Sequence, residues 1–249
     1  MSEQRGHPRT VIIAQARMGS TRLPGKVMMD ICGKPMVDHV IDRAKRSTRA
    51  DDVAVAIPDL AADDVLAQHL DTLEVMVVRG SADDVLARYT KAADESRAEV
   101  IVRITCDCPL IDPAIVNEVI SAFREGGVDY CSNTLERTYP IGMDTEVFSR
   151  EALERAHAEA TEPDEREHVT PYIWQHPERF RLRNVMAPEE FTWPELRLTV
   201  DEGADREMVS GVLAATVGTG SLGDVFLALR LRPELLQLNE SVLHRYLND

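Results

Sequence analysis

The chain has 249 residues, 44% of them hydrophobic, and a formal net charge of −15 at pH 7, so it can bury one large core or two small ones. The negative charge argues against an unspecific nucleic-acid-binding protein and against a protein held to membranes by a polybasic surface. Because the sequence has no apolar signal core and no run of about 18 apolar residues, we expect a cytoplasmic protein without a membrane or nucleic-acid partner.

The N-terminal part of the chain differs in charge from the rest. Residues 1–9 are polar, which predicts a disordered tail. Residues 1–49 contain ten Arg and Lys against four Asp and Glu, a net charge of +6, which leaves −21 for the remainder. An acidic protein that concentrates cations in this way can attract an anion at one place while its other surfaces repel nucleic acid.

The first predicted unit is a strand, a loop and a helix. Val11–Ala14 is an apolar run typical of a buried strand, and Pro35–Ala44 has apolar residues at helical spacing. The loop between them, Gln15–Lys26, has three cations, two hydroxyls and two glycines: Arg17, Arg22, Lys26, Ser20, Thr21, Gly19 and Gly25. Guanidinium, ammonium and hydroxyl groups can bind phosphate oxygens, and glycines let backbone N–H groups approach an anion.

The loop therefore suits a triphosphate, although a basic loop of arbitrary sequence is more often a solvated turn. It is not a Walker loop, because no Gly-Lys-Ser/Thr ending follows, and the dinucleotide pattern Gly-x-Gly-x-x-Gly is missing. The order of its residues, together with Gly33-Lys34-Pro35-Met36, resembles the nucleotide-binding segment of the cytidylyltransferase family. That family includes CMP-Kdo and CMP-sialic acid synthetases, and the loop is most similar to its SpsF-type spore-coat polysaccharide branch.

This resemblance implies an α/β fold of the Rossmann-like nucleotide-diphospho-sugar transferase (GT-A-like) type. We expect a mostly parallel central sheet with helices on both faces, in one domain of residues 10–249. Residues 10–127 would bind the nucleotide, 128–200 would form a small mixed acceptor and dimerisation region, and 201–249 would form C-terminal helices. The resemblance also implies that the nucleotide contacts Ala14, Gln15 and Ala16 as well as the loop.

The following elements alternate in type, which predicts βαβ units. The predicted strands and helices are Val53–Ile57, Ala61–Leu70, Glu74–Val78, Ala82–Ala93, Val100–Thr105 and Pro113–Phe123. In such sheets the ligand binds at the C-terminal ends of the strands. The loops that begin at Gln15, Arg79 and Cys106 all lie there.

The loop at Arg79 contains Ser81, and two interpretations of it remain open. By resemblance, Arg79 and Ser81 would face the cytosine. Alternatively, Ser81 is an N-cap of the helix that follows.

Two aspartates follow predicted strands and are candidate metal ligands. Asp107 comes directly after Thr105-Cys106, where Mg²⁺ could bridge a carboxylate to phosphate, and its segment resembles the family's metal-binding Asp-x-Pro-Leu loop. Asp201 follows a predicted strand, Leu196–Val200, and resembles the family's late Val-Asp-Thr-Pro-Glu-Asp segment with Thr-Pro replaced by Glu202-Gly203. The alternative for both is a turn or helix-capping role. Thr105 is included among the nucleotide-binding residues.

The second half of the chain has shorter elements and a mixed pattern. The predicted strands and helices are Asp144–Phe148, Glu151–Ala160, Glu165–Gln175, Phe180–Val185, Asp205–Val217, Gly223–Leu231 and Glu240–Tyr246. Two segments, 139–148 and 166–172, resemble SpsF-type segments that receive the second substrate. They contain the candidate acceptor-binding residues Tyr139, Gly142, Asp144, Glu146 and His168.

Of these, Asp144 could orient a hydroxyl or amine, and His168 could position the acceptor or move a proton near neutral pH. A lone histidine is more often structural. Cys106 stands where the branch commonly has Gly. The four cysteines lack the spacing of a zinc or redox site, so we expect reduced, buried thiols at Cys32, Cys106, Cys108 and Cys131.

The resemblance implies an enzyme that transfers CMP from CTP to an acidic sugar of the nonulosonic or octulosonic type, or to a phosphonate, with release of pyrophosphate. Arg17, Lys26 and Asp107 would be its catalytic residues, Mg²⁺ its cofactor and a homodimer its assembly. A GT-A-type glycosyltransferase is disfavoured because Asp107-Cys108-Pro109 replaces the usual Asp-x-Asp motif. A non-catalytic nucleotide-binding protein is the third alternative.

Overall fold

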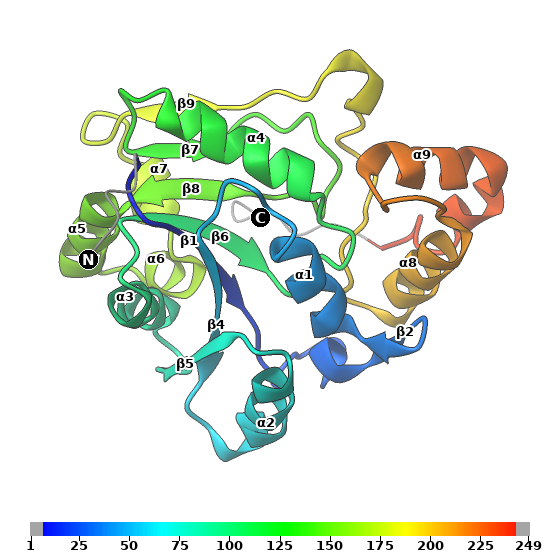
Figure 1. Ribbon diagram of the computed structural model, residues 1–249, viewed down its shortest axis with the longest axis horizontal. Helices are drawn as coiled ribbons and strands as arrows, with labels where there is room; N and C mark the ends of the chain where they lie inside the picture. The colour runs from blue at the N-terminus through cyan, green and yellow to red at the C-terminus, as the bar shows by residue number, and fades with distance from the viewer. Residues whose placement is uncertain (1–6, 243–249) are drawn as a thin grey trace.

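The computed structural model describes residues 7–242, and its centre is a seven-stranded sheet (Figure 1). The strand order is β5-β4-β1-β6-β8-β7-β9. The strands are β1 (Thr10–Gln15), β4 (Asp52–Pro58), β5 (Met76–Gly80), β6 (Val100–Thr105), β7 (Tyr130–Ser132), β8 (Glu146–Ser149) and β9 (Leu182–Asn184). The first four in the order are parallel, β8 is antiparallel to both of its neighbours, and β9 is parallel to β7. The predicted mostly parallel sheet is therefore confirmed.

Helices cover both faces of the sheet, because successive residues of the buried strands point to opposite sides. In β1, Ile12 and Ala14 belong to one apolar cluster, and Val11 and Ile13 belong to the other. The helices of the first cluster are α1 (Met36–Ala44), α2 (Asp64–Thr72), α4 (Pro113–Arg124), α8 (Gly203–Ala215) and α9 (Leu222–Leu231). Those of the second are α3 (Val85–Ser96), α5 (Arg150–Glu159) and α7 (Pro171–Trp174), and α6 (Pro163–His168) packs against α3 and α7.

Local caps explain where several helices begin. Asp84 accepts a hydrogen bond from Ala87 N at 2.9 Å at the start of α3, and Asp112 accepts one from Ala114 N at 2.8 Å at the start of α4. Ser149 and Ser221 cap α5 and α9 in the same way. Each side chain satisfies an N–H group that the first helical turn leaves free.

Two predicted elements of the second half are wrong. The helix predicted over 165–175 is divided into α6 and α7 because Val169 has a φ of 74° and Pro171 starts the second helix. The segment predicted as a strand over 196–200 forms only one isolated bridge, between Ile141 and Arg197. It is nevertheless held in place, since Val200 N donates to Asp107 O at 2.8 Å.

Smaller differences concern the ends of the chain and one hairpin. Arg9 is not part of a free tail, because its guanidinium donates to Asp52 at 2.9 Å and its backbone N–H donates to Glu99 at 2.8 Å. Residues 1–6, and most of the helix predicted over 240–246, lie outside the described residues. The strands β2 (Asp30–Ile31) and β3 (Lys34–Pro35) form an unpredicted hairpin with Cys32 at its turn, so this thiol is exposed while the other three are buried.

Within residues 7–242, none of the helices has the length and apolar character needed to cross a bilayer. The 3-10 helices are η1 (Lys26–Met28), η2 (Ala61–Asp63), η3 (Glu189–Phe191) and η4 (Pro233–Gln237).

Candidate active site

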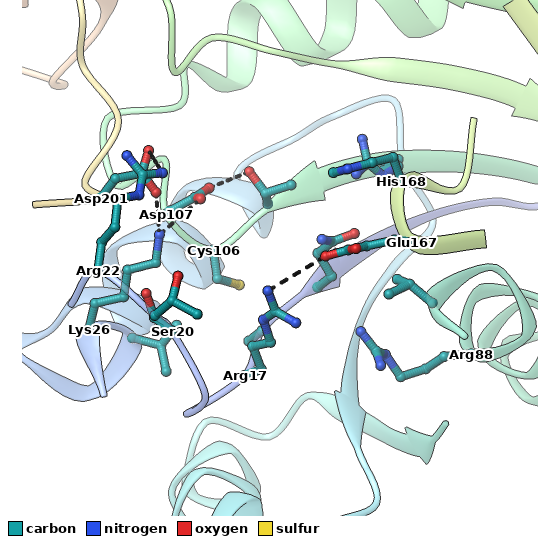
Figure 2. A pocket seen from close by; sticks show the side chains of 17 residues that line it. Arg17, Ser20, Arg22, Lys26, Arg88, Cys106, Asp107, Glu167, His168 and Asp201 are labelled. Atoms are coloured by element: carbon teal, nitrogen blue, oxygen red, sulfur yellow. Dashed lines mark hydrogen bonds and ion pairs between the residues drawn. The ribbon is translucent and has the colours of Figure 1, made fainter. Parts of the chain in front are cut away.

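A cavity of about 330 Å³ lies where β1 and β6 end (Figure 2). Its walls come from the loop after β1, from the end of β6, from α3 and α6, and from the start of the segment that leads to α8. The lining residues are Gln15, Ala16, Arg17, Ser20, Thr21, Arg22, Lys26, Val27, Val85, Arg88, Arg103, Thr105, Cys106, Asp107, Glu167, His168 and Asp201. The site thus lies at the C-terminal edge of the parallel strands, as the alternating pattern predicts.

The basic loop after β1 is held in one conformation by hydrogen bonds to Met18. The Met18 carbonyl accepts from Gly25 N at 2.9 Å and from Ser20 N at 3.0 Å. The Met18 N–H donates to the buried carboxylate of Asp63 at 2.7 Å. Gly25 has a φ of 72°, a value that glycine adopts without strain. The loop is therefore preorganised before any ligand binds.

Lys26, the last residue of this loop, lies between two carboxylates. Its Nζ donates to Asp107 Oδ2 at 3.1 Å, to Asp201 Oδ1 at 2.8 Å and to the Val200 carbonyl at 2.9 Å. The left part of Figure 2 shows this group. The second oxygen of each carboxylate is held by the protein: Asp107 Oδ1 accepts from the Thr105 hydroxyl, and Asp201 Oδ2 accepts from Arg197 at 2.7 Å.

These contacts keep all three groups charged. Burial alone would raise the pKa of Asp107 and of Asp201, but Lys26 together with the hydrogen bonds from Thr105 and Arg197 outweighs it, so the pKa of Asp107 is lowered and that of Asp201 falls to about 2. For Lys26 itself, burial lowers the pKa and the two carboxylates raise it further, so the net shift is upward. Near pH 7 the cavity thus presents two ionised carboxylates and one ammonium.

The opposite end of the cavity is formed by the C-terminal end of α6. Arg17 Nη2 lies 3.9 Å from Glu167 Oε1, and both side chains are about half exposed. Figure 2 shows Arg17 between the carboxylate group and this end, with His168 and Arg88 beyond it. An exposed ion pair of this kind contributes roughly 0–1 kcal/mol, so Arg17 can leave it for a ligand.

A strained turn directs His168 toward the cavity. Val169 has φ 74° and ψ −53°, and Thr170 N donates to His168 O at 2.9 Å. Together these define a γ-turn with positive φ, which is rare and costs about 1–3 kcal/mol for a β-branched residue. Burial lowers the pKa of His168, so its imidazole is neutral near pH 7.

A buried ion pair stands behind the cavity. Arg103 and Glu146 face each other across β6 and β8, and their side chains form an ion pair. Glu146 also accepts from the hydroxyls of Tyr130 and Thr170, at 2.6 Å and 2.5 Å. Because Thr170 belongs to the turn after His168, Glu146 connects the strand that carries Arg103 to the turn that positions His168.

A family model described as cytidylyltransferase matches residues 11–205. The chain belongs to the cytidylyltransferase family. The resemblance in the basic loop is thereby confirmed, and the chain is a nucleotidyltransferase.

Its relatives include proteins of both predicted branches. The spore coat polysaccharide biosynthesis protein SpsF of Bacillus subtilis is 35% identical over 207 residues, which cover 81% of this chain and 85% of that protein. A 3-deoxy-manno-octulosonate cytidylyltransferase of Anaeromyxobacter sp. is 34% identical, covering 66% of this chain and 72% of its own. A solved cytidylyltransferase structure from Leptospira borgpetersenii matches with a TM-score of 0.87 and 31% identity, covering 96% of this chain and all of that one. The predicted fold is confirmed by this match.

Most of the predicted nucleotide-binding residues of the cytidylyltransferase lie together. Those that line the cavity are Gln15, Ala16, Arg17, Ser20, Thr21, Arg22, Lys26 and Thr105, beside the predicted metal ligands Asp107 and Asp201. Ala14 is fully buried under it. Gly19 and Gly25 do not line the cavity. Gly25 has a positive φ, whereas an added Cβ at Gly19 would meet nothing within 4 Å.

The loop after β5 is not brought into the cavity. Arg79 is paired with Asp59 at 3.2 Å and Asp64 at 2.7 Å, and Ser81 accepts from Asp84 N at 3.0 Å. This is a contact within the turn before α3, whose N-cap is Asp84, so the alternative prediction that Ser81 is the N-cap is wrong. A role of Arg79 and Ser81 in reading the base has no support from this geometry.

The predicted acceptor residues are mostly engaged elsewhere, and only His168 of the set lines the cavity. Asp144 forms a bidentate pair with Arg137, at 2.7 Å and 2.8 Å. Tyr139 is buried and donates to Glu118 at 2.8 Å. Gly142 has a φ of 104°, and a Cβ there would lie 2.9 Å from the Leu198 backbone. Glu146 is occupied by Arg103, as described above.

Three charged lining residues were not predicted: Arg88, Arg103 and Glu167. Arg88 lies on the apolar side of α3 with Val85 and Tyr89. A charged residue on the apolar side of a predicted helix could have indicated a functional role from the sequence. Arg103 interrupts the apolar run of β6 in the same manner. Glu167 had no signal beyond its position next to His168.

The residues present fit a divalent cation of the magnesium type. Asp107 Oδ2 and Asp201 Oδ1 face the same point in the cavity, which the ammonium group of Lys26 occupies. Mg²⁺ is commonly held in proteins by one or two carboxylates together with substrate phosphates. In residues 7–242 no group of three or more His, Cys, Asp or Glu side chains could hold a metal, so further ligands would come from the nucleotide and water.

Proposed function

We propose that this cytidylyltransferase transfers CMP from CTP to an acidic sugar of the nonulosonic or octulosonic acid type, or to a related acceptor such as a phosphonate, with Mg²⁺ as its cofactor. The observation that carries the proposal is the placement of the preorganised basic loop opposite two ionised carboxylates in one cavity. The relatives named for spore-coat polysaccharide biosynthesis and for 3-deoxy-manno-octulosonate support the acceptor class.

The basic loop would hold the β- and γ-phosphates. Arg17 lies 3.9 Å from Glu167, and Arg22 lies 3.2 Å from Asp201 and 3.7 Å from Glu202, in pairs that are exposed or partly exposed. They can therefore turn to phosphate oxygens at low cost. Ser20 and Thr21 add hydroxyl donors on the same loop. Groups fixed in this way stabilise the charge that grows on the leaving pyrophosphate.

Asp107 and Asp201 would hold the Mg²⁺ ion, which when bound withdraws charge from the phosphate oxygens. The protein keeps these two carboxylates ionised and oriented through Thr105 and Arg197. Cys106 stays a protonated thiol, because burial and the adjacent Asp107 raise its pKa. It forms part of the cavity wall and does not act as a nucleophile.

The acceptor would enter at the α6 end, where His168 is neutral and can accept a hydrogen bond from an acceptor hydroxyl. Arg88 lines the cavity nearby and favours an anionic acceptor over a neutral one, whereas the charge of Arg103 is compensated by Glu146. The acceptor oxygen then attacks the α-phosphorus of CTP, the bond to the β-phosphate oxygen breaks, and pyrophosphate leaves. A homodimer and a cytoplasmic location remain predictions.

A pyrophosphate-release screen tests this function. CTP, UTP, ATP and GTP are each offered with octulosonic and nonulosonic acids, phosphonates and polyol phosphates, with and without Mg²⁺. The proposal expects release with CTP, an acidic acceptor and Mg²⁺ together. Equal release with all four nucleotides, or release only with polyol phosphates, would contradict it.

A further inference from the structure

The ammonium group of Lys26 occupies the point where Asp107 and Asp201 would bind a divalent cation. Its three N–H bonds are used by Asp107, Asp201 and the Val200 carbonyl, at 3.1, 2.8 and 2.9 Å. The Lys26 side chain is 11% exposed, so this is not a loose surface pair. A cation belonging to the chain itself already holds the two carboxylates.

Each carboxylate contributes one oxygen to Lys26 and keeps the other on the protein. Asp107 Oδ1 is held by Thr105, and Asp201 Oδ2 is held by Arg197 and Arg22. The two oxygens that face Lys26 therefore stay in position when the ammonium leaves.

Lys26 can leave without a rearrangement of its loop. The backbone before it is fixed by the bonds of Met18 to Asp63 and to Gly25, at 2.7 Å and 2.9 Å. The lysine side chain is a flexible chain of four carbons, so rotation about its bonds moves the ammonium away from the carboxylates. A triphosphate held by the loop would offer the ammonium group other negatively charged oxygen acceptors within the same cavity.

We propose that Lys26 is an intramolecular competitor of the metal ion, which makes metal binding depend on the nucleotide. The proposal rests on the proposed function for the metal site and the triphosphate. An ammonium and a divalent ion cannot share two carboxylates without strong repulsion. In the nucleotide-free enzyme a free ion therefore binds poorly, and once the triphosphate takes over Lys26 the carboxylates become available. Metal and nucleotide enter together.

The expected gain in metal affinity depends on the fraction of time that the Lys26 ammonium occupies the site between the two carboxylates. If Lys26 holds the site about 99% of the time, the apparent affinity for a free ion is reduced by about 100-fold. Replacing Lys26 by a neutral residue of similar length removes this reduction.

Mn²⁺ is the probe, and its binding is measured by electron paramagnetic resonance of the free ion, without nucleotide. Lys26→Met should bind Mn²⁺ at least about 10-fold more tightly than the wild type, and Lys26→Gln serves as a second neutral variant. Arg22→Met is the matched control, because it removes a charge 3.2 Å from Asp201 and leaves Lys26 seated. Adding Asp201→Asn to Lys26→Met should abolish the gain.

Several results would overturn the proposal. Lys26 variants with wild-type Mn²⁺ affinity would do so, and so would an equal gain in Arg22→Met, which would indicate a general charge effect. If the wild type binds Mn²⁺ tightly without nucleotide and Asp201→Asn abolishes this binding, the lysine does not compete. Pyrophosphate release by the wild type is a separate result: its absence removes the transferase proposal, and a missing Mn²⁺ gain removes only the competitor role.

Discussion

The buried carboxylate of Asp63 accepts a hydrogen bond from the backbone N–H of Met18 at 2.7 Å. This contact connects the basic loop after β1 to η2, the short helix that leads into α2, across 45 residues of sequence. Asp63 is 1% exposed, and it lies outside the cavity lining. The shape of the basic loop therefore depends on a residue outside the cavity.

Asp63→Ala should destabilise the protein and weaken nucleotide binding. The variant leaves the Met18 N–H without its partner, at a cost of about 1–3 kcal/mol. We expect a lower urea midpoint and a higher KM for CTP. Asp71→Ala is the control, since Asp71 is exposed on the last turn of α2 and its loss should change stability by less than about 0.5 kcal/mol. Equal effects of the two variants would show that the Asp63 contact does not matter.

The Arg103–Glu146 pair should behave as one unit. Glu146→Leu leaves a buried guanidinium without its carboxylate, which costs about 3–5 kcal/mol. The double variant Arg103→Met/Glu146→Leu removes both charges and should be less destabilised than Glu146→Leu alone. Chemical unfolding of the two single variants and the double variant measures the coupling. Additive losses would mean that the two side chains act independently.

Protonation of Asp201 should lower the free energy of unfolding at acid pH. Burial would raise the pKa of Asp201, but Lys26, Arg197 and Arg22 together outweigh it and lower this pKa from 3.8 to about 2. A carboxylate with a depressed folded pKa contributes stability above its unfolded pKa and loses it as the pH falls through the folded value. The shift corresponds to about 2 kcal/mol, lost between about pH 4 and pH 2.

Urea unfolding from pH 2 to pH 6 checks this. Asp201→Asn should show a shallower acid loss than the wild type, whereas the exposed control Asp71→Asn should follow the wild-type curve. Lys26 has a raised pKa, so its contribution is complete below its ordinary pKa of 10.5 and is lost only at higher pH. Unchanged acid unfolding in Asp201→Asn would argue against the ionised cluster.

His168→Gln should impair the reaction with the acceptor and spare the nucleotide. Under the proposed function, kcat/KM for the acceptor falls by about 10²-fold, while the Kd for CTP stays within about threefold. Burial lowers the pKa of His168, so the wild-type rate should decline only below about pH 6.5, and this acid limb should vanish in the variant. His176→Gln, outside the cavity, is the control. A variant with weakened CTP binding and an unchanged limb would refute this role.

The first half of the chain could be predicted well because its strands are continuous apolar runs and its helices have apolar residues at helical spacing. The strand predicted at Val100–Thr105 has the observed bounds of β6, and Pro113 with Asp112 marks the start of α4. A buried parallel strand is a continuous apolar run, and Pro or Asp signals a helix start. The family motif then located the basic loop and Asp107.

The remaining features depend on contacts between distant residues. Lys26 bonds to Asp107 and Asp201 across 81 and 175 residues, and no local pattern reports such a contact. The positive φ of Val169 is imposed by its surroundings, because a β-branched residue avoids that conformation. The segment over 196–200 has an apolar pattern but only one bridging residue, so it packs without forming a strand. Glu146 resembled an acceptor ligand because a motif cannot show that Arg103 already occupies it.

The most direct test of the account is the Mg²⁺-dependent release of pyrophosphate from CTP by the wild type and by Asp107→Asn, with an octulosonic or nonulosonic acid as acceptor. We expect release by the wild type and a loss of about 10² to 10³ in turnover for Asp107→Asn, with Asp83→Asn, an exposed acid outside the cavity, behaving as the wild type. No CTP-dependent release with any acidic acceptor, or normal turnover in a folded Asp107→Asn variant, would contradict the account.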